Sequence, residues 1–231
     1  MKLQLIERKP EVPGVESFIF EPQEPLSWKA GQFLHYVLHH EPTDDRGSDR
    51  WFTVASAPYE KNVMITTRHS EEKGSSFKNA LFSLKTGEMI EVSDTDGDFT
   101  VDDLEKEYVF IAGGIGVTPF HSILKELEHQ GAKVKATLLY SNRDENVAYK
   151  AELERLASVN KNLRIEYIIA GRIDEAKIRE TVTDLQKPLF YVSGPEPMVN
   201  AFNDMLKKMG VPEGNIKGDW FPGYTAESGH A

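Results

Sequence analysis

The sequence contains no cysteine among its 231 residues, and this absence excludes several kinds of chemistry. There is no disulfide framework, no thiol nucleophile, no thiolate-ligated zinc and no cysteine-ligated iron–sulfur cluster. Apolar runs are also short, and none approaches the roughly 18 residues that a membrane-spanning helix needs. Met1 to Arg8 show no basic start followed by a long apolar stretch, so we expect no secretory signal and a cytoplasmic protein.

Positive charge is scarce as well. The chain has 27 Lys and Arg against 37 Asp and Glu, which gives a formal net charge of −10. Nucleic acids and anionic membranes are bound mainly by clustered lysine and arginine, so neither is an expected partner. Hydrophobic residues make up 39% of the chain, which suits a folded protein, and its length suits two domains of about 100–130 residues each.

The first half of the chain has the pattern of a small β-domain. Short runs rich in β-branched and aromatic residues alternate with turns, which predicts an antiparallel barrel over residues 1–102. One helix is expected to begin at Ser75 or Ser76. The expected strands include Ser17–Phe20, Gln32–Leu38, Val63–Thr67 and Met89–Val92.

The second half of the chain has a different pattern of apolar residues. Tyr108–Ala112 is a continuous apolar run, typical of a strand that is buried on both faces. Strands and helices then alternate, which predicts a parallel α/β domain over residues 103–231. Further strands are expected at 134–140, 163–169 and 189–192, and helices at 119–129, 148–157, 175–185 and 196–209.

A glycine-rich segment, Gly113–Pro119, joins the first strand of this second half to the helix that follows. Thr118 is expected to be the N-cap and Pro119 to lie in the first helical turn. Glycine lets backbone amides approach a phosphate, and the dipole at a helix N-terminus favours an anion. The spacing departs from the strict G-x-G-x-x-G pattern, so by itself it suits a tight turn as well as a nucleotide loop.

Three other segments carry the residue types of a cofactor site. Arg50–Thr53 combines an arginine, an aromatic ring and a hydroxyl on one strand, which suits a phosphate, a flat ring and a hydrogen-bond acceptor. Lys73–Ser76 is a Gly/Ser turn at a helix start, where an anion can bind. Tyr191–Pro195 ends a strand at the edge where parallel sheets bind ligands. Each of these segments alone also suits ordinary structure.

In this order, the segments resemble the ferredoxin–NADP reductase superfamily of flavoprotein reductases, over about residues 14–224. The matching motifs are Gly31–Phe33, Arg50-x-Phe52-Thr53, Gly74–Ser76, Gly87 with Gly97–Phe99, Gly113–Pro119, and Ser193–Pro195 with Met198. Serine 193 stands where the family usually has cysteine, and Phe52 where tyrosine is commoner. The resemblance implies a six-stranded Greek-key antiparallel β-barrel that binds FAD, and an α/β parallel-sheet domain that binds NAD(P)H.

The resemblance also implies roles for individual residues. Arg50 is expected to pair with the flavin diphosphate, Phe52 to lie against the isoalloxazine ring, and Thr53 to hydrogen-bond near flavin N5. The expected catalytic residues are Thr53, Ser193 and Phe221. The expected cofactor-binding residues are Arg50, Trp51, Phe52, Thr53, Thr66, Gly74, Ser75, Ser76, Gly113, Gly114, Gly116, Thr118, Pro119, Ser141, Arg143, Ser193, Gly194, Pro195, Met198, Phe221 and Tyr224.

Nucleotide preference and the role of the aromatic C-terminal segment stay open. Ser141 and Arg143 favour the 2′-phosphate of NADPH, whereas Asp144 favours the ribose diol of NADH. Either Phe221 or Tyr224 is expected to cover the flavin face where nicotinamide binds, unless these rings only fill the interface between domains.

The expected function is hydride transfer from NAD(P)H to FAD, followed by electron transfer to an external acceptor. The acceptor is a protein, a partner subunit, a quinone or a ferric complex, and the alternative is a non-catalytic flavin-binding relay or regulatory subunit. A flavin-free Rossmann dehydrogenase is disfavoured, because the glycine loop follows about a hundred β-rich residues. No metal is expected, since the acidic run at 94–98 has Phe99 where a calcium loop needs glycine.

Overall fold

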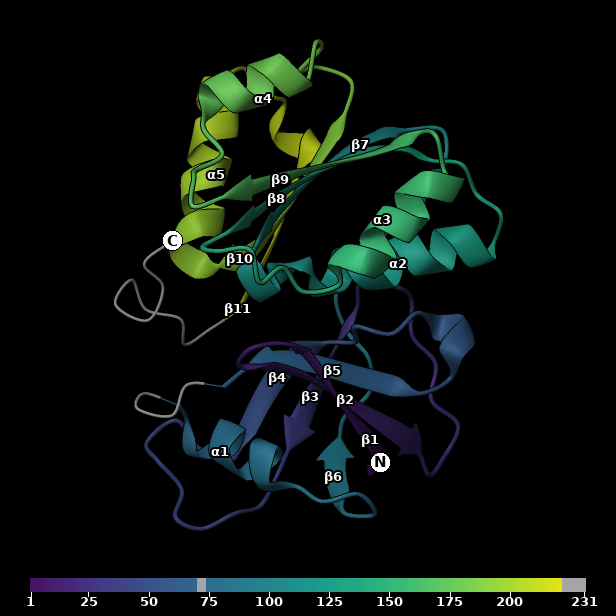
Figure 1. Cartoon of the computed structure of the whole chain (residues 1–231), viewed down its shortest axis with the longest axis vertical. Helices are drawn as coiled ribbons and strands as arrows, with labels where there is room; N and C mark the ends of the chain where they lie inside the picture. Colours follow the sequence, from purple (N-terminus) through teal and green to yellow (C-terminus); the bar gives the residue numbers. More distant parts are fainter. Residues whose placement is uncertain (70–73, 222–231) are drawn as a thin grey trace.

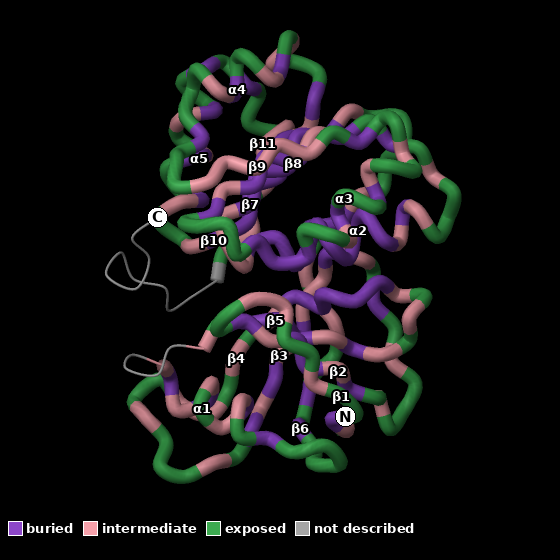
Figure 2. Tube along the Cα trace, in the orientation of Figure 1, coloured by how far each residue is buried: buried purple, intermediate pink, exposed green. Residues whose placement is uncertain are grey.

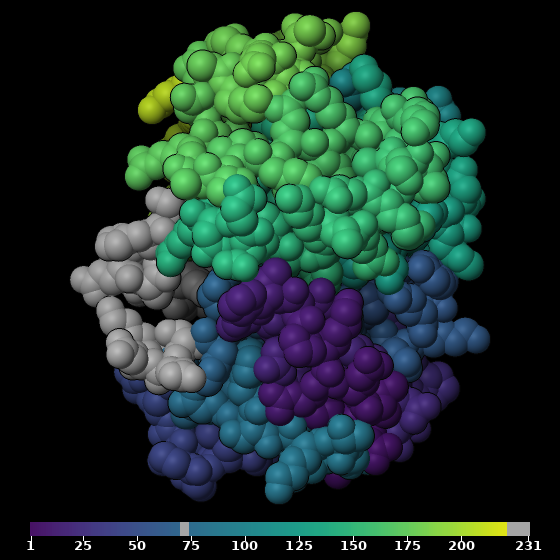
Figure 3. Space-filling model, in the orientation of Figure 1, coloured from purple at the N-terminus to yellow at the C-terminus, as the bar shows by residue number. Residues whose placement is uncertain are grey.

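The chain forms two parts, each built on one sheet, which lie one above the other in Figure 1. The computed structural model describes residues 1–69 and 74–221. Figure 3 shows atoms of the two parts in contact across the middle of the molecule. No helix in the described segments is both long and apolar enough to cross a membrane.

The lower part is an antiparallel sheet whose strands, within the described residues, run in the order β4-β3-β6-β1-β2-β5. Its elements are β1 (Lys2–Val12), β2 (Val15–Pro22), β3 (Phe33–Val37), β4 (Asp49–Thr53), η1 (Pro58–Glu60), β5 (Val63–Arg68), α1 (Ser76–Ser83) and β6 (Met89–Val92). The outer strands meet just beyond β4, where the Ala55 amide donates to the Met64 carbonyl oxygen at 2.8 Å. This bond brings the edges of the sheet together, and the predicted six-stranded antiparallel barrel fold is confirmed.

The core of the barrel consists of alternate strand residues that point inward, among them Phe18, Phe20 and Leu34. The predicted helix also lies against this core, because Phe77 and Leu81 are buried and the Ser75 side chain accepts from the Lys78 amide. Strand β1 was not predicted. Its second half is charged and largely exposed, so it lacks the clear alternation that marks the other strands.

The upper part is a parallel sheet in the order β11-β10-β7-β8-β9 among the residues described. Its elements are β7 (Glu107–Gly113), η2 (Gly114–Val117), α2 (Thr118–His129), β8 (Lys135–Asn142), α3 (Lys150–Val159), β9 (Leu163–Ile169), α4 (Glu175–Thr181), β10 (Leu189–Pro195), α5 (Glu196–Lys208), η3 (Glu213–Asn215) and β11 (Ile216–Phe221). The strand order reverses at β7, which has β8 on one side and β10 on the other. In open parallel sheets ligands bind at such a switch point, beyond the carboxyl ends of the strands.

Helices cover both faces of this sheet, so its central strands are buried (Figures 1 and 2). Residues of α2 and α3 pack with Tyr108 and Phe110 of β7. Residues of α4 and α5 pack with Val109 and Ile111, which point to the opposite face. The predicted α/β parallel sheet is confirmed, and the buried pattern of β7 accounts for its continuous apolar sequence.

Three details of the upper part differ from expectation. Thr118 is not the N-cap, because the 3₁₀ turn η2 runs directly into α2 and the Thr118 hydroxyl donates to the Ile115 carbonyl at 3.2 Å. Helix α4 ends at Thr181 and is thus shorter than predicted. Strand β11 was not predicted at all, because within the described residues it pairs with β10 alone and its sequence has no alternating apolar pattern.

Candidate cofactor site

Strand β4 carries the expected flavin motif. Thr53 is buried, while the Phe52 ring contacts those of Tyr36 and Phe77, with centroids 5.8 and 5.9 Å apart. Trp51 points the other way along the strand, is 44% exposed, and stacks on His35 at 4.4 Å. The motif therefore offers a half-buried ring and a buried hydroxyl from consecutive positions.

Arg50 has an unused hydrogen-bond donor in a buried place. Its Nη1 donates to the carbonyl oxygens of Arg46, at 2.7 Å, of Gly47, at 3.3 Å, and of Asp49. Its Nη2 is buried and has no hydrogen-bond partner among residues 1–69 and 74–221. Burial lowers the pKa of Arg50. A buried, unpartnered guanidinium donor is unfavourable unless an anion binds there, so the site fits a diphosphate.

The N-terminus of α1 lies beside this arginine and is occupied by a carboxylate of the chain. The Ser76 amide donates to Asp44 Oδ2 at 2.8 Å, and the Asp44 amide donates to Ser76 Oγ at 3.0 Å. Arg46 Nη2 donates to the same Oδ2 at 2.9 Å and to the Gly74 carbonyl at 3.3 Å. Arg50 Nη2 lies 3.9 Å from Asp44 Oδ1.

These contacts, led by the Ser76 amide, lower the pKa of Asp44 to about 2. A negatively charged oxygen therefore sits where the Gly74–Ser76 motif is expected to bind phosphate. The sequence analysis missed Asp44, which comes from the polar loop between β3 and β4 and carries no local signal of a partner 32 positions away.

The glycine segment after β7 closes against the end of β10. A side chain at Gly116 would place its Cβ 2.2 Å from the Ser193 carbonyl oxygen, and one at Gly113 would lie 2.3 Å from Met198 Sδ. Gly114 has a φ of +53°, a conformation that favours glycine. Met198 also lies 3.0 Å from the position of a Cβ at Gly194. Two expected nucleotide-binding segments thus meet at the switch point.

Three other expected residues flank this loop. Thr118 and Pro119 are both buried at the start of α2. Pro195 ends β10 and is the N-cap residue of α5. Their positions place two helix N-termini next to the glycine segment, where backbone amides are available to an anion.

Ser193 is fully buried and pairs with a residue that the sequence analysis missed. Its hydroxyl donates to Asp219 Oδ2 at 3.2 Å, because β10 and β11 are in register at these two positions. Burial raises the pKa of Asp219 to about 6. Asp219 lies two positions before Phe221, but only the unpredicted strand β11 brings it to Ser193.

The remaining expected residues lie at several places. Ser141 pairs with Gly113 across β8 and β7, and its hydroxyl donates to the Gly171 carbonyl at 3.3 Å. Thr66 bonds to Ser17 Oγ at 2.7 Å and to the Tyr149 hydroxyl, so its oxygen is engaged within the protein. Arg143 follows the end of β8. Phe221 ends β11, but its side chain and all of Tyr224 lie outside the described residues.

An antiparallel barrel packed against a parallel α/β sheet is the fold of flavin-dependent reductases. Residues 110–204 match the model of the oxidoreductase NAD-binding domain family. The chain is 28% identical over 236 residues to a flavohemoprotein of Rhodopirellula baltica, covering 90% of this chain and 57% of that protein.

Two further relatives support the same placement. The chain is 26% identical over 223 residues to the ferredoxin reductase component of a 3-ketosteroid-9-alpha-monooxygenase from Rhodococcus rhodochrous, covering 91% of this chain and 62% of that protein. The flavohem-like FAD/NAD-binding domain of nitric oxide dioxygenase from Vibrio cholerae has a TM-score of 0.83 at 21% identity, covering 95% and 98% of the two chains.

Over most of its length the chain is similar to proteins of the ferredoxin–NADP reductase-like superfamily, so the predicted resemblance is confirmed. The predicted oxidoreductase class and the pairing of FAD with NAD(P)H are those of this superfamily. The chain spans about six tenths of the length of the curated relatives named above, at 57% and 62%.

Proposed function

We propose that this chain is an FAD-dependent reductase unit that takes a hydride from NAD(P)H and passes electrons to an external acceptor. Residues 1–102 would bind the flavin and residues 103–231 the nicotinamide nucleotide. The observation that carries the proposal is the unpartnered, buried Nη2 of Arg50 beside the N-terminus of α1, because it suits an anionic cofactor.

On the flavin side, Arg50 and the Ser76 amide would hold the diphosphate, with Gly74 and Ser75 in the same turn. Phe52 supplies a ring and Thr53 a hydroxyl next to it on β4. When bound, the flavin accepts a hydride and releases electrons one at a time, which is chemistry that no side chain supplies.

On the nucleotide side, Gly113, Gly114 and Gly116 would let backbone amides approach the nucleotide phosphates at the switch point. Ser193 lies beside this loop with its hydroxyl directed to Asp219 Oδ2, which fixes the orientation of both groups. Because the pKa of Asp219 is raised to about 6, its carboxyl group carries a proton over part of the mildly acidic range. Phe221 and Tyr224 stay predictions as the ring that covers the flavin.

The acceptor is external to residues 1–231. With no cysteine, the chain cannot ligate a cysteine-bound iron–sulfur cluster. A protein, a partner subunit, a quinone or a ferric complex would take the electrons. A non-catalytic flavin-binding relay is the second candidate, because the curated relatives named above extend well beyond the length that this chain covers.

The test begins with FAD binding, measured by fluorescence titration of wild type and Arg50→Ala. Loss of a charge-assisted contact of about 1.5–3 kcal/mol should weaken FAD binding roughly ten- to a hundredfold. Arg179→Ala is the matched control, because Arg179 forms an exposed pair with Glu175 on α4 at 2.8 Å, away from the site.

NAD(P)H is then added without oxygen to the FAD-loaded wild type. Bleaching of the flavin absorbance supports the reductase, whereas nucleotide binding without bleaching supports the relay. A wild-type protein that binds neither FAD nor FMN contradicts both.

A further inference from the structure

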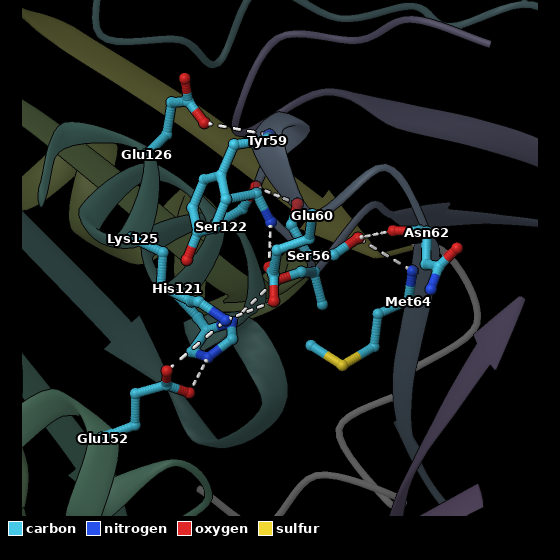
Figure 4. A network of polar contacts seen from close by, with 12 residues as sticks. Ser56, Tyr59, Glu60, Asn62, Met64, His121, Ser122, Lys125, Glu126 and Glu152 are labelled. Atoms are coloured by element: carbon cyan, nitrogen blue, oxygen red, sulfur yellow. Dashed lines mark hydrogen bonds and ion pairs between the residues drawn. The ribbon is translucent and has the colours of Figure 1, made fainter. Parts of the chain in front are cut away.

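Two consecutive side chains of α2 form hydrogen bonds with two consecutive backbone carbonyl groups, which come just after the flavin motif of β4. His121 Nδ1 lies 2.7 Å from the Ala55 carbonyl oxygen, and the Ser122 hydroxyl donates to the Ser56 carbonyl oxygen at 2.6 Å. Figure 4 shows this junction between the two parts of the molecule. The Ala55 amide also donates to the Met64 carbonyl oxygen, so both the amide and the carbonyl group of Ala55 have a hydrogen-bond partner.

The partners of His121 determine its protonation. Nδ1 faces a carbonyl oxygen, and Nε2 lies 2.8 Å from Glu152 Oε2. The bond to His121 and the charge of the nearby lysine lower the pKa of Glu152 to about 2, so its carboxyl group is ionised near neutral pH. Both neighbours of the ring are therefore acceptors, and both ring nitrogens must donate. The buried His121 ring, only 1% exposed, is an imidazolium that stacks on Tyr149 at 3.8 Å.

Charged groups from three elements surround this cation. Lys125 of α2 lies 2.6 Å from Glu60 Oε1 of η1 and 3.5 Å from Glu152 Oε1 of α3. The charges thus alternate from Glu60 to Lys125 to Glu152 to His121 across the junction. A buried cation is stable only when it is paired and hydrogen-bonded, and this arrangement supplies both conditions.

We propose that His121 is a positioning residue that sets the distance between the flavin motif and the nucleotide loop, an inference that rests on the proposed function. Ala55 lies two positions after Thr53, and His121 lies three positions after Thr118, so the bond between them joins the two motifs closely. Hydride transfer needs reacting atoms about 3–3.5 Å apart, and a displacement of 1 Å can slow such a reaction roughly a hundredfold.

The contact with Ala55 depends on the hydrogen-bond roles of the two ring nitrogens of His121. Loss of either ring proton would place a nitrogen lone pair against the Ala55 carbonyl or the Glu152 carboxylate. Tyr149 stacks on the ring, and Lys125 and Glu60 continue the line of charges beyond Glu152.

The protonation is tested on the protein without added cofactor. Nitrogen-15 NMR at pH 7 should show both His121 ring nitrogens protonated, with the signals assigned by their loss in His121→Gln. A ring with one proton overturns the inference, because the bond to Ala55 or to Glu152 would then be absent.

The positioning role is tested by stopped-flow reduction of the FAD-loaded protein at saturating NAD(P)H. His121→Phe keeps a ring against Tyr149 but removes both hydrogen bonds, and should slow the limiting rate at least about tenfold. Affinities for FAD and for the nucleotide should change less than about twofold, because no binding group is removed. Ser122→Ala should slow reduction less, in the same direction.

Arg155→Gln is the matched control. Arg155 also joins α3 to α2, through Glu128 at 2.6 and 2.7 Å, and this pair lies within the upper part, so the reduction rate of the variant should stay at the wild-type value. If His121→Phe does not fold, His121→Gln and Ser122→Ala decide the same question. A folded variant with the wild-type rate contradicts this inference alone, whereas a wild type without flavin contradicts the proposed function and the inference together.

Discussion

The amide of Ser76 donates to Asp44 Oδ2 over 2.8 Å, so a carboxylate of the chain caps the first turn of α1. The same carboxylate accepts from Arg46 and lies near Arg50. The Ser76 amide and Arg50 are the groups that the proposed function assigns to the flavin diphosphate. A bound diphosphate and the Asp44 side chain would therefore compete for one helix N-terminus.

This competition predicts that Asp44→Asn binds FAD more tightly than wild type. An amide is a weaker acceptor than a carboxylate and does not repel phosphate, so we expect a gain of roughly two- to tenfold, equivalent to about 0.5–1.5 kcal/mol. FAD fluorescence titration measures the gain. Asp45→Asn, at the exposed neighbouring position, is the control for net charge and should change affinity little. Weaker binding in Asp44→Asn would mean that Asp44 orders the site instead of competing for it.

Gly116→Ala should disrupt the nucleotide loop. Its Cβ would lie 2.2 Å from the Ser193 carbonyl oxygen, so β10 and the loop must move apart. We expect a loss of about 1–3 kcal/mol in the free energy of unfolding, with weaker NAD(P)H binding and unchanged FAD binding. Gly214→Ala is the control, since nothing lies within 4 Å of its added Cβ. Wild-type nucleotide affinity in Gly116→Ala would show that the loop does not bind the nucleotide.

Asp219→Asn should raise stability at neutral and higher pH. Burial raises the pKa of Asp219 to about 6 from its usual value near 4, so the native state retains a proton that the unfolded state releases. Wild-type stability should therefore fall as pH rises from about 4 to about 6, by at most about 3 kcal/mol. Asparagine removes this penalty. Thermal unfolding should show the variant more stable than wild type at pH 8, with the gain absent below pH 4.

Glu213→Gln serves as a comparison in which stability should depend on pH in the opposite direction. Its hydrogen bond with Lys207 lowers the pKa of Glu213, so any contribution to stability is lost as pH falls. An Asp219→Asn profile parallel to wild type across pH 4–8 would mean that the Asp219 carboxyl group is hydrated in the folded protein.

Arg143→Ala tests nucleotide preference. Arg143 follows β8, whose residue Ser141 pairs with Gly113 of the nucleotide loop. If Arg143 binds the 2′-phosphate of NADPH, the ratio of kcat/KM for NADPH to that for NADH should fall about tenfold in the variant. Arg164→Ala is the control, because Arg164 pairs with Glu166 on β9 and faces Thr137, away from the loop. An unchanged ratio would mean that Arg143 does not determine the nucleotide preference and would leave Asp144 as the candidate.

Local sequence signals predicted the elements whose pattern of buried residues or helix cap can be recognised within a few positions. Tyr108–Ala112 is apolar throughout because both faces of β7 are covered, and Ser75 predicts the start of α1 because its side chain caps the helix. The edge strand β11 and the long strand β1 were missed. Both depend on their neighbours more than on their own periodicity, so the sequence near them carries a weak signal.

The order of the motifs, and with it the resemblance to the superfamily, can be read from the chain alone, because glycines, an arginine and helix caps act over a few residues. The tertiary structure alone brought together Ser76 with Asp44, Ser193 with Asp219, and Ala55 with His121, which are 32, 26 and 66 positions apart. Such pairs arise when separately folded segments pack, and each member alone is an ordinary polar residue. The periodicity of a chain records which side of an element is buried, whereas its polar partners depend on the packing of the whole fold.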